Sequence, residues 1–171
     1  DISPEDKAWL EKANPYFKEV IDAKIEELRR IRETKLAVKS GIVPKTDAEK
    51  LFEEIIKPYK GKVVVVDFWN TWCLPCLSAI KKIEPLKNGE LKNDKIVWLY
   101  LADVSSPETD YNKQIQSIKG EHYRLSAEQS KTIKRQFGIT AIPSYVLVDG
   151  DGNYNLRNDF HNIEIMKKEL K

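Results

Sequence analysis

The stretch VVVVDFWNTWCLPCLSAI, from Val63 to Ile80, joins a β-branched run to the two cysteines of the chain, Cys73 and Cys76. The run from Lys62 to Phe68 predicts a strand buried on both faces, as in a parallel or mixed central sheet. Apolar residues after Cys76 recur at helical spacing as far as Lys87, which predicts a helix. The cysteines are therefore expected at a strand-to-helix turn.

This placement favours a reactive pair of thiols over a structural cross-link. Two cysteines in 171 residues are too few for a disulfide scaffold, and linking such close neighbours removes little unfolded-chain entropy. A helix N-terminus stabilises a thiolate at Cys73 through its free N–H groups and positive dipole end. Pro75 suits the first helical turn, where a missing N–H has no intrahelical acceptor. We expect Cys73 to be the exposed nucleophile and Cys76, one turn deeper, to be the resolving thiol.

Two other interpretations of the cysteines stay open. CxxC is the usual half of a zinc site, but such a site needs four ligands, and only His122 and His161 are left to complete one. We expect each histidine to be a surface or partly packed side chain, and no metal ion. The second alternative is a pair of inert buried thiols, although burial explains neither the proline nor the turn.

The composition predicts an ordinary soluble protein, with 41% hydrophobic residues, 33% charged residues and a formal net charge of +2. Acidic and basic residues interleave, so nothing indicates binding to nucleic acid or to an anionic membrane surface. The longest apolar run is far shorter than the roughly 18 residues that suggest a membrane span. The chain starts without a methionine or a leader, so we expect any targeting signal to have been removed.

Capping residues and apolar periodicity predict the other elements. One helix starts at Ser3, and a longer one runs from Asn14-Pro15 to about Lys39, before Gly41. Capping boxes at Thr46–Glu49 and Ser126–Gln129 predict helices that end at Pro58 and at Phe137-Gly138, and Asn162 caps a final helix. A further helix is expected from Ser106-Pro107 to Gly120. The expected strands are Lys95 to Val104, Glu121 to Leu125, and a hairpin of Tyr145–Val148 and Asn153–Leu156.

Two segments carry a family resemblance. DFWNTWCLPC, from Asp67 to Cys76, resembles the thioredoxin active-site signature, and GITAIPSYVLVD, from Gly138 to Asp149, resembles its cis-proline segment. The segment from about Ser106 to Leu125 and the GDGNY hairpin are most similar to TlpA/ResA-like thiol-disulfide oxidoreductases exported by bacteria, including those of the Bacteroides group. The resemblance implies an α/β, thioredoxin-like domain over residues 46–171, with a mixed central sheet flanked by helices. Residues 1–45 are left as an all-helical N-terminal extension.

The resemblance also implies roles near the cysteines. Asp67 matches a buried aspartate whose raised pKa lets it accept the Cys76 proton, with a solvent-facing strand-end acid as the alternative. Pro143 matches a proline that follows a cis peptide bond, faces the disulfide and leaves the Ile142 backbone open to an extended substrate. A trans turn proline is the alternative at this position.

Four further residues complete the expected site. Trp72 is predicted to be a surface ring that contacts the partner, and Trp69 to pack in the core. Leu74 and Pro75 support the site, but this dipeptide departs from the Gly-Pro of thioredoxins and leaves the redox potential open.

The predicted function is a thiol-disulfide oxidoreductase that reduces protein disulfides, with no cofactor besides the redox-active disulfide. A redox-sensing or protein-binding module without efficient turnover is the alternative, followed by a metal-binding protein. By resemblance, the partners are protein disulfides or dithiols and a membrane-linked electron donor, and the location is the periplasm or cell envelope of a Gram-negative bacterium. We expect a monomer, with a homodimer as the alternative.

The long N-terminal helix carries an apolar stripe that must be buried against something. We expect it to fold back on the thioredoxin-like domain, while pairing with a second copy or docking of a partner remain open. The stripe consists of Phe17, Ile21, Ile25, Leu28 and Ile31.

Overall fold

The computed structural model describes residues 3–13 and 15–171, and the chain divides into two compact units, residues 1–36 and 37–171. The first unit contains α1 (Pro4–Ala13) and most of α2 (Pro15–Ala37). Ser3 caps α1 as predicted, because the Asp6 N–H donates to Ser3 Oγ at 3.1 Å. Asn14 and the side chain of Phe17 lie outside the described residues, and the packing of the α2 stripe stays a prediction. In the described ranges no helix is long and apolar enough to span a membrane.

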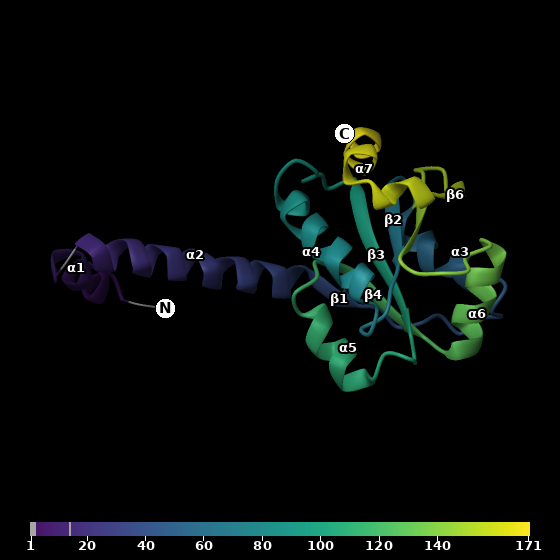
Figure 1. Ribbon diagram of the computed structural model, residues 1–171, viewed down its shortest axis with the longest axis horizontal. Helices are drawn as coiled ribbons and strands as arrows, with labels where there is room; N and C mark the ends of the chain where they lie inside the picture. Colours follow the sequence, from purple (N-terminus) through teal and green to yellow (C-terminus); the bar gives the residue numbers. More distant parts are fainter. Residues whose placement is uncertain (1–2, 14) are drawn as a thin grey trace. The chain divides into compact units, whose positions relative to one another are not determined.

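The second unit is built on a mixed sheet, which confirms the predicted fold class. β2 pairs in parallel with β3, and β4 pairs in parallel with both β3 and β1, whereas β5 is antiparallel to β2 and β6. The six strands lie in the spatial order β1 (Val38–Ser40), β4 (Gly120–Leu125), β3 (Ile96–Asp103), β2 (Val63–Phe68), β5 (Ser144–Val148) and β6 (Tyr154–Leu156) (Figure 1).

Helices cover both faces of this sheet (Figure 1). One face packs against α4 (Leu74–Asn88), α5 (Glu108–Ile115) and α7 (Ile163–Leu170). The other packs against α3 (Leu51–Ile56) and α6 (Ala127–Gln136). Two 3-10 helices, Lys57–Tyr59 and Asn158–His161, complete the set of described elements.

β2 is buried on both faces, as its β-branched run predicted. Val65 packs in the core cluster of α4, whereas Val64 and Val66 pack in the cluster of α3 and α6. Successive side chains of a strand point to opposite faces, so Asp67 follows Val65 onto the α4 side. The alternation thus places a carboxyl group in the core beneath α4.

Two predicted caps are confirmed. Ser126 Oγ accepts from the Gln129 N–H at 3.2 Å, and the Ser126 N–H donates to the Gln129 side chain, which completes the capping box of α6. Asn162 Oδ1 accepts from the Glu164 N–H at 3.0 Å and caps α7. These local signals fix where both helices begin.

The end of α2 differs from the prediction. The helix stops at Ala37 rather than near Lys39, because residues 38–40 pair in parallel with residues 120–122 of β4. Pairing with a distant strand overrides the local helical pattern. Residues 37–45 therefore belong to the second unit, and the helical extension ends at residue 36 instead of at 45.

The predicted capping box at Thr46–Glu49 does not start a helix. A turn occupies this region, with the Lys50 N–H donating to the Asp47 carbonyl at 3.0 Å, and Lys50 is the N-cap of α3 without a side-chain cap bond. α3 starts instead at Leu51, where the first of its buried apolar side chains enters the core. Burial, not the cap, decides this start.

Gly120 begins β4 instead of ending the preceding helix, which stops at Ile115. Its φ of +147° is a conformation that L side chains rarely adopt. A Cβ atom there would lie 2.5 Å from the Trp98 carbonyl oxygen. Glycine is therefore required where β4 approaches β3.

Candidate active site

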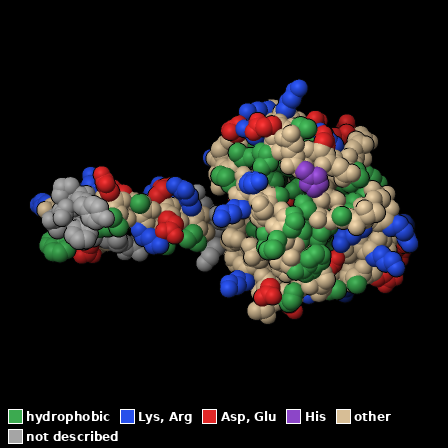
Figure 2. Space-filling view, in the orientation of Figure 1, with side chains coloured by type: hydrophobic (Ala, Val, Ile, Leu, Met, Phe, Trp, Pro, Cys, Tyr) green, Lys and Arg blue, Asp and Glu red, His purple; other side chains and the backbone are tan. Residues whose placement is uncertain are grey.

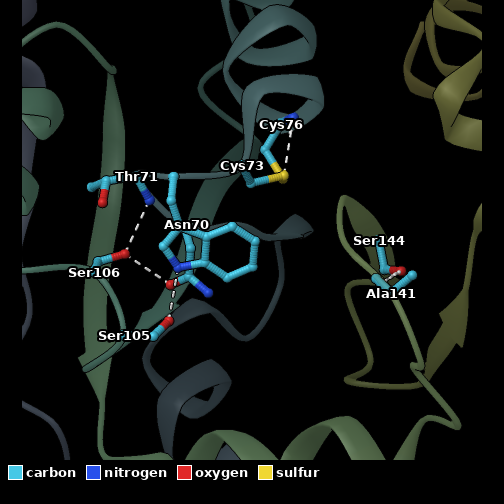
Figure 3. Close-up of a disulfide and its surroundings, with 9 residues drawn as sticks. Asn70, Thr71, Cys73, Cys76, Ser105, Ser106, Ala141 and Ser144 are labelled. Atoms are coloured by element: carbon cyan, nitrogen blue, oxygen red, sulfur yellow. Dashed lines mark hydrogen bonds between the residues drawn. A yellow bond between two sulfur atoms is a disulfide. The ribbon is translucent and has the colours of Figure 1, made fainter.

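Cys73 and Cys76 form a disulfide at the N-terminus of α4, with their Cα atoms 5.3 Å apart (Figure 3). Cys73 is itself the N-cap of the helix, since its Sγ accepts from the Cys76 N–H at 3.2 Å. Pro75 lies in the first turn, as predicted. The helix thus presents an N–H group and its positive dipole end to the Cys73 sulfur, an environment that stabilises a thiolate.

Both cysteines are less accessible than the predicted turn suggested. Cys73 is 4% exposed and Cys76 is 0% exposed, and both belong to the core cluster beneath α4. Cys73 is the outer thiol, as expected, but it is not an open surface group. A partner must therefore fit closely against the residues that border Cys73.

Asp67 is buried on β2, with 3% of its surface exposed. Burial raises the pKa of its carboxyl group to about 7, although the positive charge of Lys87 opposes the rise. The alternative of a solvent-facing acid is wrong. A carboxyl group with a pKa near neutrality can take up and release a proton at physiological pH. That it accepts the Cys76 proton stays a prediction.

Asp67 belongs to a row of four buried polar side chains that crosses the sheet. Strand pairing places Asp67 opposite Tyr145 on β5 and Tyr100 on β3, and it places Tyr100 opposite His122 on β4. All four are at most 3% exposed. Within the described part of the chain, Asp67 Oδ1, Tyr145 OH and His122 Nδ1 have no hydrogen-bond partner. Of the five buried side-chain polar atoms without a partner in the described residues, three lie in this row.

His122 was expected at the surface or partly packed, and this expectation is wrong. Its ring is stacked on Tyr100 with the centroids 4.9 Å apart, and Nε2 lies 2.8 Å from the Ile118 carbonyl oxygen. Burial lowers the pKa of His122 to about 4, so the imidazole is neutral near pH 7. The alternation along β4 carries it into the core rather than outward.

Lys87 is a buried cation beside this row that the sequence analysis missed. It comes from the last turn of α4, and its ammonium group donates to Glu84, to Tyr100 OH and, at 2.8 Å, to the Lys119 carbonyl. Burial lowers the pKa of Lys87 to about 8, while the charges of Glu84 and Asp67 oppose the shift. The Lys87 charge in turn favours the ionised form of Asp67.

A second polar network holds the loop between β2 and α4 (Figure 3). Ser106 Oγ accepts from the Thr71 N–H at 3.0 Å and donates to Asn70 Oδ1 at 2.9 Å. Asn70 Oδ1 also accepts from the Asp103 N–H at 3.0 Å. The loop that leads to Cys73 is thereby tied to the end of β3.

The two tryptophans of the loop have the predicted exposures. Trp69 is 1% exposed and packs in the core cluster, whereas Trp72 is 58% exposed. The Trp72 indole N–H donates to Ser105 Oγ at 3.0 Å, which anchors the ring to the turn after β3. Leu74 is 76% exposed. Contact of Trp72 with a partner stays a prediction.

The Ile142-Pro143 peptide bond is cis, as the resemblance implied, so the trans alternative is wrong. Ile142 packs against the core cluster that contains both cysteines. Ser144 Oγ donates to the Ala141 carbonyl at 2.8 Å and closes this turn. In Figure 3 the Ala141–Ser144 turn and the Ser105–Ser106 turn lie on either side of the disulfide.

Metal ligands do not gather in the described ranges. No group of three or more His, Cys, Asp or Glu side chains there could hold an ion. The two thiols of the CxxC pair are joined to each other.

A mixed sheet, a CxxC disulfide at a helix N-terminus and a cis-proline turn define a thioredoxin-like site. Residues 61–154 match the family described as Thioredoxin-like, and the chain belongs to this family. The thiol-disulfide oxidoreductase ResA of Bacillus thuringiensis (strain Al Hakam) is 29% identical over 98 residues, which cover 57% of this chain and 54% of that protein. The chain thus spans about half the length of the curated relatives it matches.

Solved structures share the fold. The thioredoxin domain of a thiol-disulfide oxidoreductase from Bacteroides vulgatus matches with a TM-score of 0.55 and 22% identity, over 68% of this chain and 84% of that chain. A thiol:disulfide interchange protein from Bacteroides sp. matches with a TM-score of 0.52 and 24% identity, over 65% of this chain and 76% of that chain. The predicted thioredoxin-like family is confirmed, and the predicted similarity to ResA is found over 57% of the chain.

Proposed function

We propose that this chain is a thiol-disulfide oxidoreductase that reduces protein disulfides. The observation that carries the proposal is the Cys73-Cys76 disulfide, capped by the N-terminus of α4 and accompanied by a buried carboxyl group on β2. The names of the curated relatives, including ResA and the thiol:disulfide interchange protein HelX of Rhodobacter capsulatus, support the same chemistry.

The proposed reaction transfers two electrons from the dithiol to the substrate. The Cys73 thiolate attacks one sulfur of a substrate disulfide, which forms a mixed disulfide and releases the other substrate sulfur as a thiolate. Cys76 then loses its proton to Asp67 and attacks the Cys73 sulfur. The Cys73-Cys76 disulfide forms, the second substrate thiol leaves, and an external dithiol donor must reduce the enzyme for the next cycle.

The environment of each group supports this order of events. Cys73 is the outer thiol and receives the helix N–H, so it is the better nucleophile. Cys76 is fully buried, so its proton needs an acceptor inside the core, and the buried Asp67 carboxyl has a pKa of about 7. An acceptor with a pKa near the working pH transfers protons efficiently.

Trapping separates the two thiols. With protein disulfide substrates, Cys76→Ser should accumulate mixed disulfides on Cys73, and Cys73→Ser should accumulate almost none. Non-reducing gels followed by mass spectrometry detect the adducts. Equal trapping by both variants would contradict the assigned order.

Turnover separates an enzyme from a sensor. The wild-type chain should accelerate the reduction of insulin by dithiothreitol, and the double variant Cys73→Ser/Cys76→Ser should not. A sensor or a binding module would be oxidised and reduced once without accelerating the insulin reaction. Zinc release on thiol titration, with and without a chelator, would instead favour the metal-binding alternative.

The reducing direction is supported by the Leu74-Pro75 dipeptide, which contains no histidine, together with the buried carboxyl group. Potentials of this class of site span roughly −270 to −120 mV, and a reductase lies toward the negative end. Equilibration with a glutathione redox buffer measures the potential. A value near −120 mV would assign the chain to the oxidases instead.

The proposed setting is the cell envelope, where a membrane-linked dithiol protein supplies the electrons and the chain acts as a monomer. The TlpA/ResA-like resemblance supports this setting. Fractionation of cells that carry the tagged, full-length protein tests the location, and sedimentation tests the oligomeric state. Recovery in the cytoplasmic fraction would contradict the envelope location, and sedimentation at twice the monomer mass would contradict the monomer.

A further inference from the structure

Exposed apolar side chains border the disulfide. Trp72, Leu74 and Val104 are 58%, 76% and 46% exposed. Trp72 and Leu74 flank Cys73 in the sequence, and Val104 follows the end of β3, at the same edge of the sheet as the end of β2. Hydrophobic side chains gather on the face shown in Figure 2, where the loop before α4 approaches α5 in Figure 1. Apolar groups around a reactive centre are typical of a surface that binds a protein.

Two depressions meet on this surface at Ser105. One, of about 550 Å³, is lined by Trp72 and by residues of α5. The other, of about 700 Å³, lies between Val104 and α6 and reaches Ile139. Because Ser105 lines both, the two depressions adjoin there, and together they extend from Trp72 to Ile139, in the segment that leads into the cis-proline turn. We call the pair of depressions the groove. Two adjoining depressions that begin at Trp72, the residue before Cys73, suit an extended polypeptide.

The two halves of the groove differ in charge. In the Trp72 half, the charged lining residues are Asp110 and Lys113, which balance each other. The α6 half contains three basic side chains and one carboxylate. These are Lys131, Lys134, Arg135 and Asp103.

Asp103 does not cancel this excess. Burial opposes its ionised form, but hydrogen bonds from Ser105, Lys134 and Ser130 outweigh that effect and hold the pKa of Asp103 well below its usual range. Its negative charge therefore offsets one cation, Lys134, whose Nζ lies 3.1 Å from Asp103 Oδ2.

The other two cations face solvent. Arg135 is 4.0 Å from Glu49 in an exposed pair, which contributes little. Lys131 is exposed and forms no ion pair with any residue that the structure describes. The α6 half thus keeps positive charge available to a ligand, and a carboxylate is the group that complements it.

We propose that the groove binds an extended segment of the substrate protein with an aspartate or glutamate near its reactive cysteine, and that α6 binds this acid. The preference rests on the proposed function and narrows its substrate class. The apolar residues next to the substrate cysteine contact Trp72 and Val104, while the carboxylate lies over Lys131 and Arg135. The groove therefore selects among substrates by charge as well as by shape.

Three linear peptides test the preference. They share a single cysteine that is held as a mixed disulfide with glutathione and has one apolar residue on each side. They differ only in the residue beyond each apolar one, which is glutamate, glutamine or lysine. With dithiothreitol as the electron donor, the wild-type chain should reduce the glutamate peptide with about tenfold higher kcat/KM than the lysine peptide at low ionic strength. The ratio should fall toward one as salt screens the charges.

Two matched variants distinguish the effect of the α6 cations from the effect of the protein's total charge. The double variant Lys131→Glu/Arg135→Glu should lose or reverse the preference. The variant Lys81→Glu/Lys82→Glu makes the same charge change on exposed positions of α4 that line neither depression, and it should keep the preference. Thermal unfolding checks that both variants are folded.

A binding assay makes the outcome independent of turnover. The same peptides with serine in place of cysteine, labelled for fluorescence anisotropy, should bind in the order glutamate, glutamine, lysine. Equal kcat/KM values for the three peptides, or a preference that survives the α6 double variant, would overturn the inference and leave the oxidoreductase intact. Failure to reduce any peptide and insulin alike would overturn the proposed function itself.

Discussion

Two polar regions flank the active-site loop, and they are built in opposite ways. Around Asn70 the side-chain oxygen is satisfied twice, since Oδ1 accepts from Ser106 and from the Asp103 N–H, and Ser106 also accepts from the Thr71 N–H. Around Asp67, three of the four side chains in the row keep a polar atom without a partner in the described residues. The first region fixes geometry, whereas the second holds groups whose proton can move.

The difference has an energetic basis. A buried polar group without a partner costs about 1 to 3 kcal/mol, and a buried charge costs more. A carboxyl group in such surroundings avoids part of this cost by staying protonated, which is why burial raises the pKa of Asp67 to about 7. The burial of Asp67 thus lowers the stability of the fold and also gives the carboxyl group a pKa at which it can accept a proton.

The largest effect expected is on the pH dependence of stability in Asp67→Asn. The pKa of Asp67 is raised from 3.8 to about 7 on folding, so between these pH values the folded state holds a proton that the unfolded state has released. The free energy of unfolding therefore falls as pH rises through this window, by roughly 4 kcal/mol at about 1.4 kcal/mol per pKa unit. Asparagine removes this contribution.

Urea unfolding of the oxidised wild type and of Asp67→Asn at pH 4 to 8 measures the pH-dependent contribution of Asp67 to the free energy of unfolding. The variant should be the more stable protein at pH 8, and the gap should close toward pH 4. Parallel pH curves for the two proteins would show that Asp67 does not carry the shift.

The second effect is on the release of the mixed disulfide. Asp67→Asn keeps the size of the side chain and removes the proton acceptor, so attack by Cys76 should slow by about 10² near pH 7. Rapid-quench measurement of the mixed disulfide on Cys73 follows this step. The first attack by Cys73 is the internal control and should change much less. An unchanged release rate from pH 6 to 8 would contradict the role of Asp67 as the proton acceptor of Cys76.

The third effect concerns the hydrogen-bond network around Asn70. Asn70→Ala removes the acceptor shared by Ser106 and the Asp103 N–H, so it should destabilise the fold by about 2 kcal/mol. Thr71→Ala is the matched control, because Thr71 joins the network through its backbone N–H. Urea unfolding compares the two. A larger loss for Thr71→Ala than for Asn70→Ala would reverse the reading of this network.

The smallest effect concerns Lys87→Met. Its charge favours the ionised form of Asp67, so removal should raise the pKa of Asp67 and move the pH profile of mixed-disulfide release upward by about one unit. Lys92→Met, an exposed lysine on the same side of the unit, should leave the profile in place. If Lys87 has only a structural role, Lys87→Met should lower the stability of the fold and leave the pH profile of mixed-disulfide release unchanged.

Much of the fold follows from local signals in the sequence. The β-branched run before Cys73, the proline after it and the capping box at Ser126 each act over a few residues, and each is confirmed. The cis bond at Pro143 was implied by the resemblance, not by any local pattern.

The rest depends on contacts between distant residues. β1 is a strand only because β4 lies beside it, and Asn70 meets Ser106 across 36 positions. Lys87 had one local signal, since it continues the buried helical positions Ile80 and Ile83 of α4. A charged residue at an apolar position of this kind marks a buried ion pair, but its partners come from other elements.

The pairing of β1 with β4 also has a mechanical consequence. Any tension applied to residues 1–36 enters the second unit through β1, which is paired over residues 38–40 and is anchored next by the Gly41 N–H on the His122 carbonyl. So short an edge strand should detach under load before the central strands. The disulfide would survive this step, because it lies at the end of β2, three strands further into the sheet.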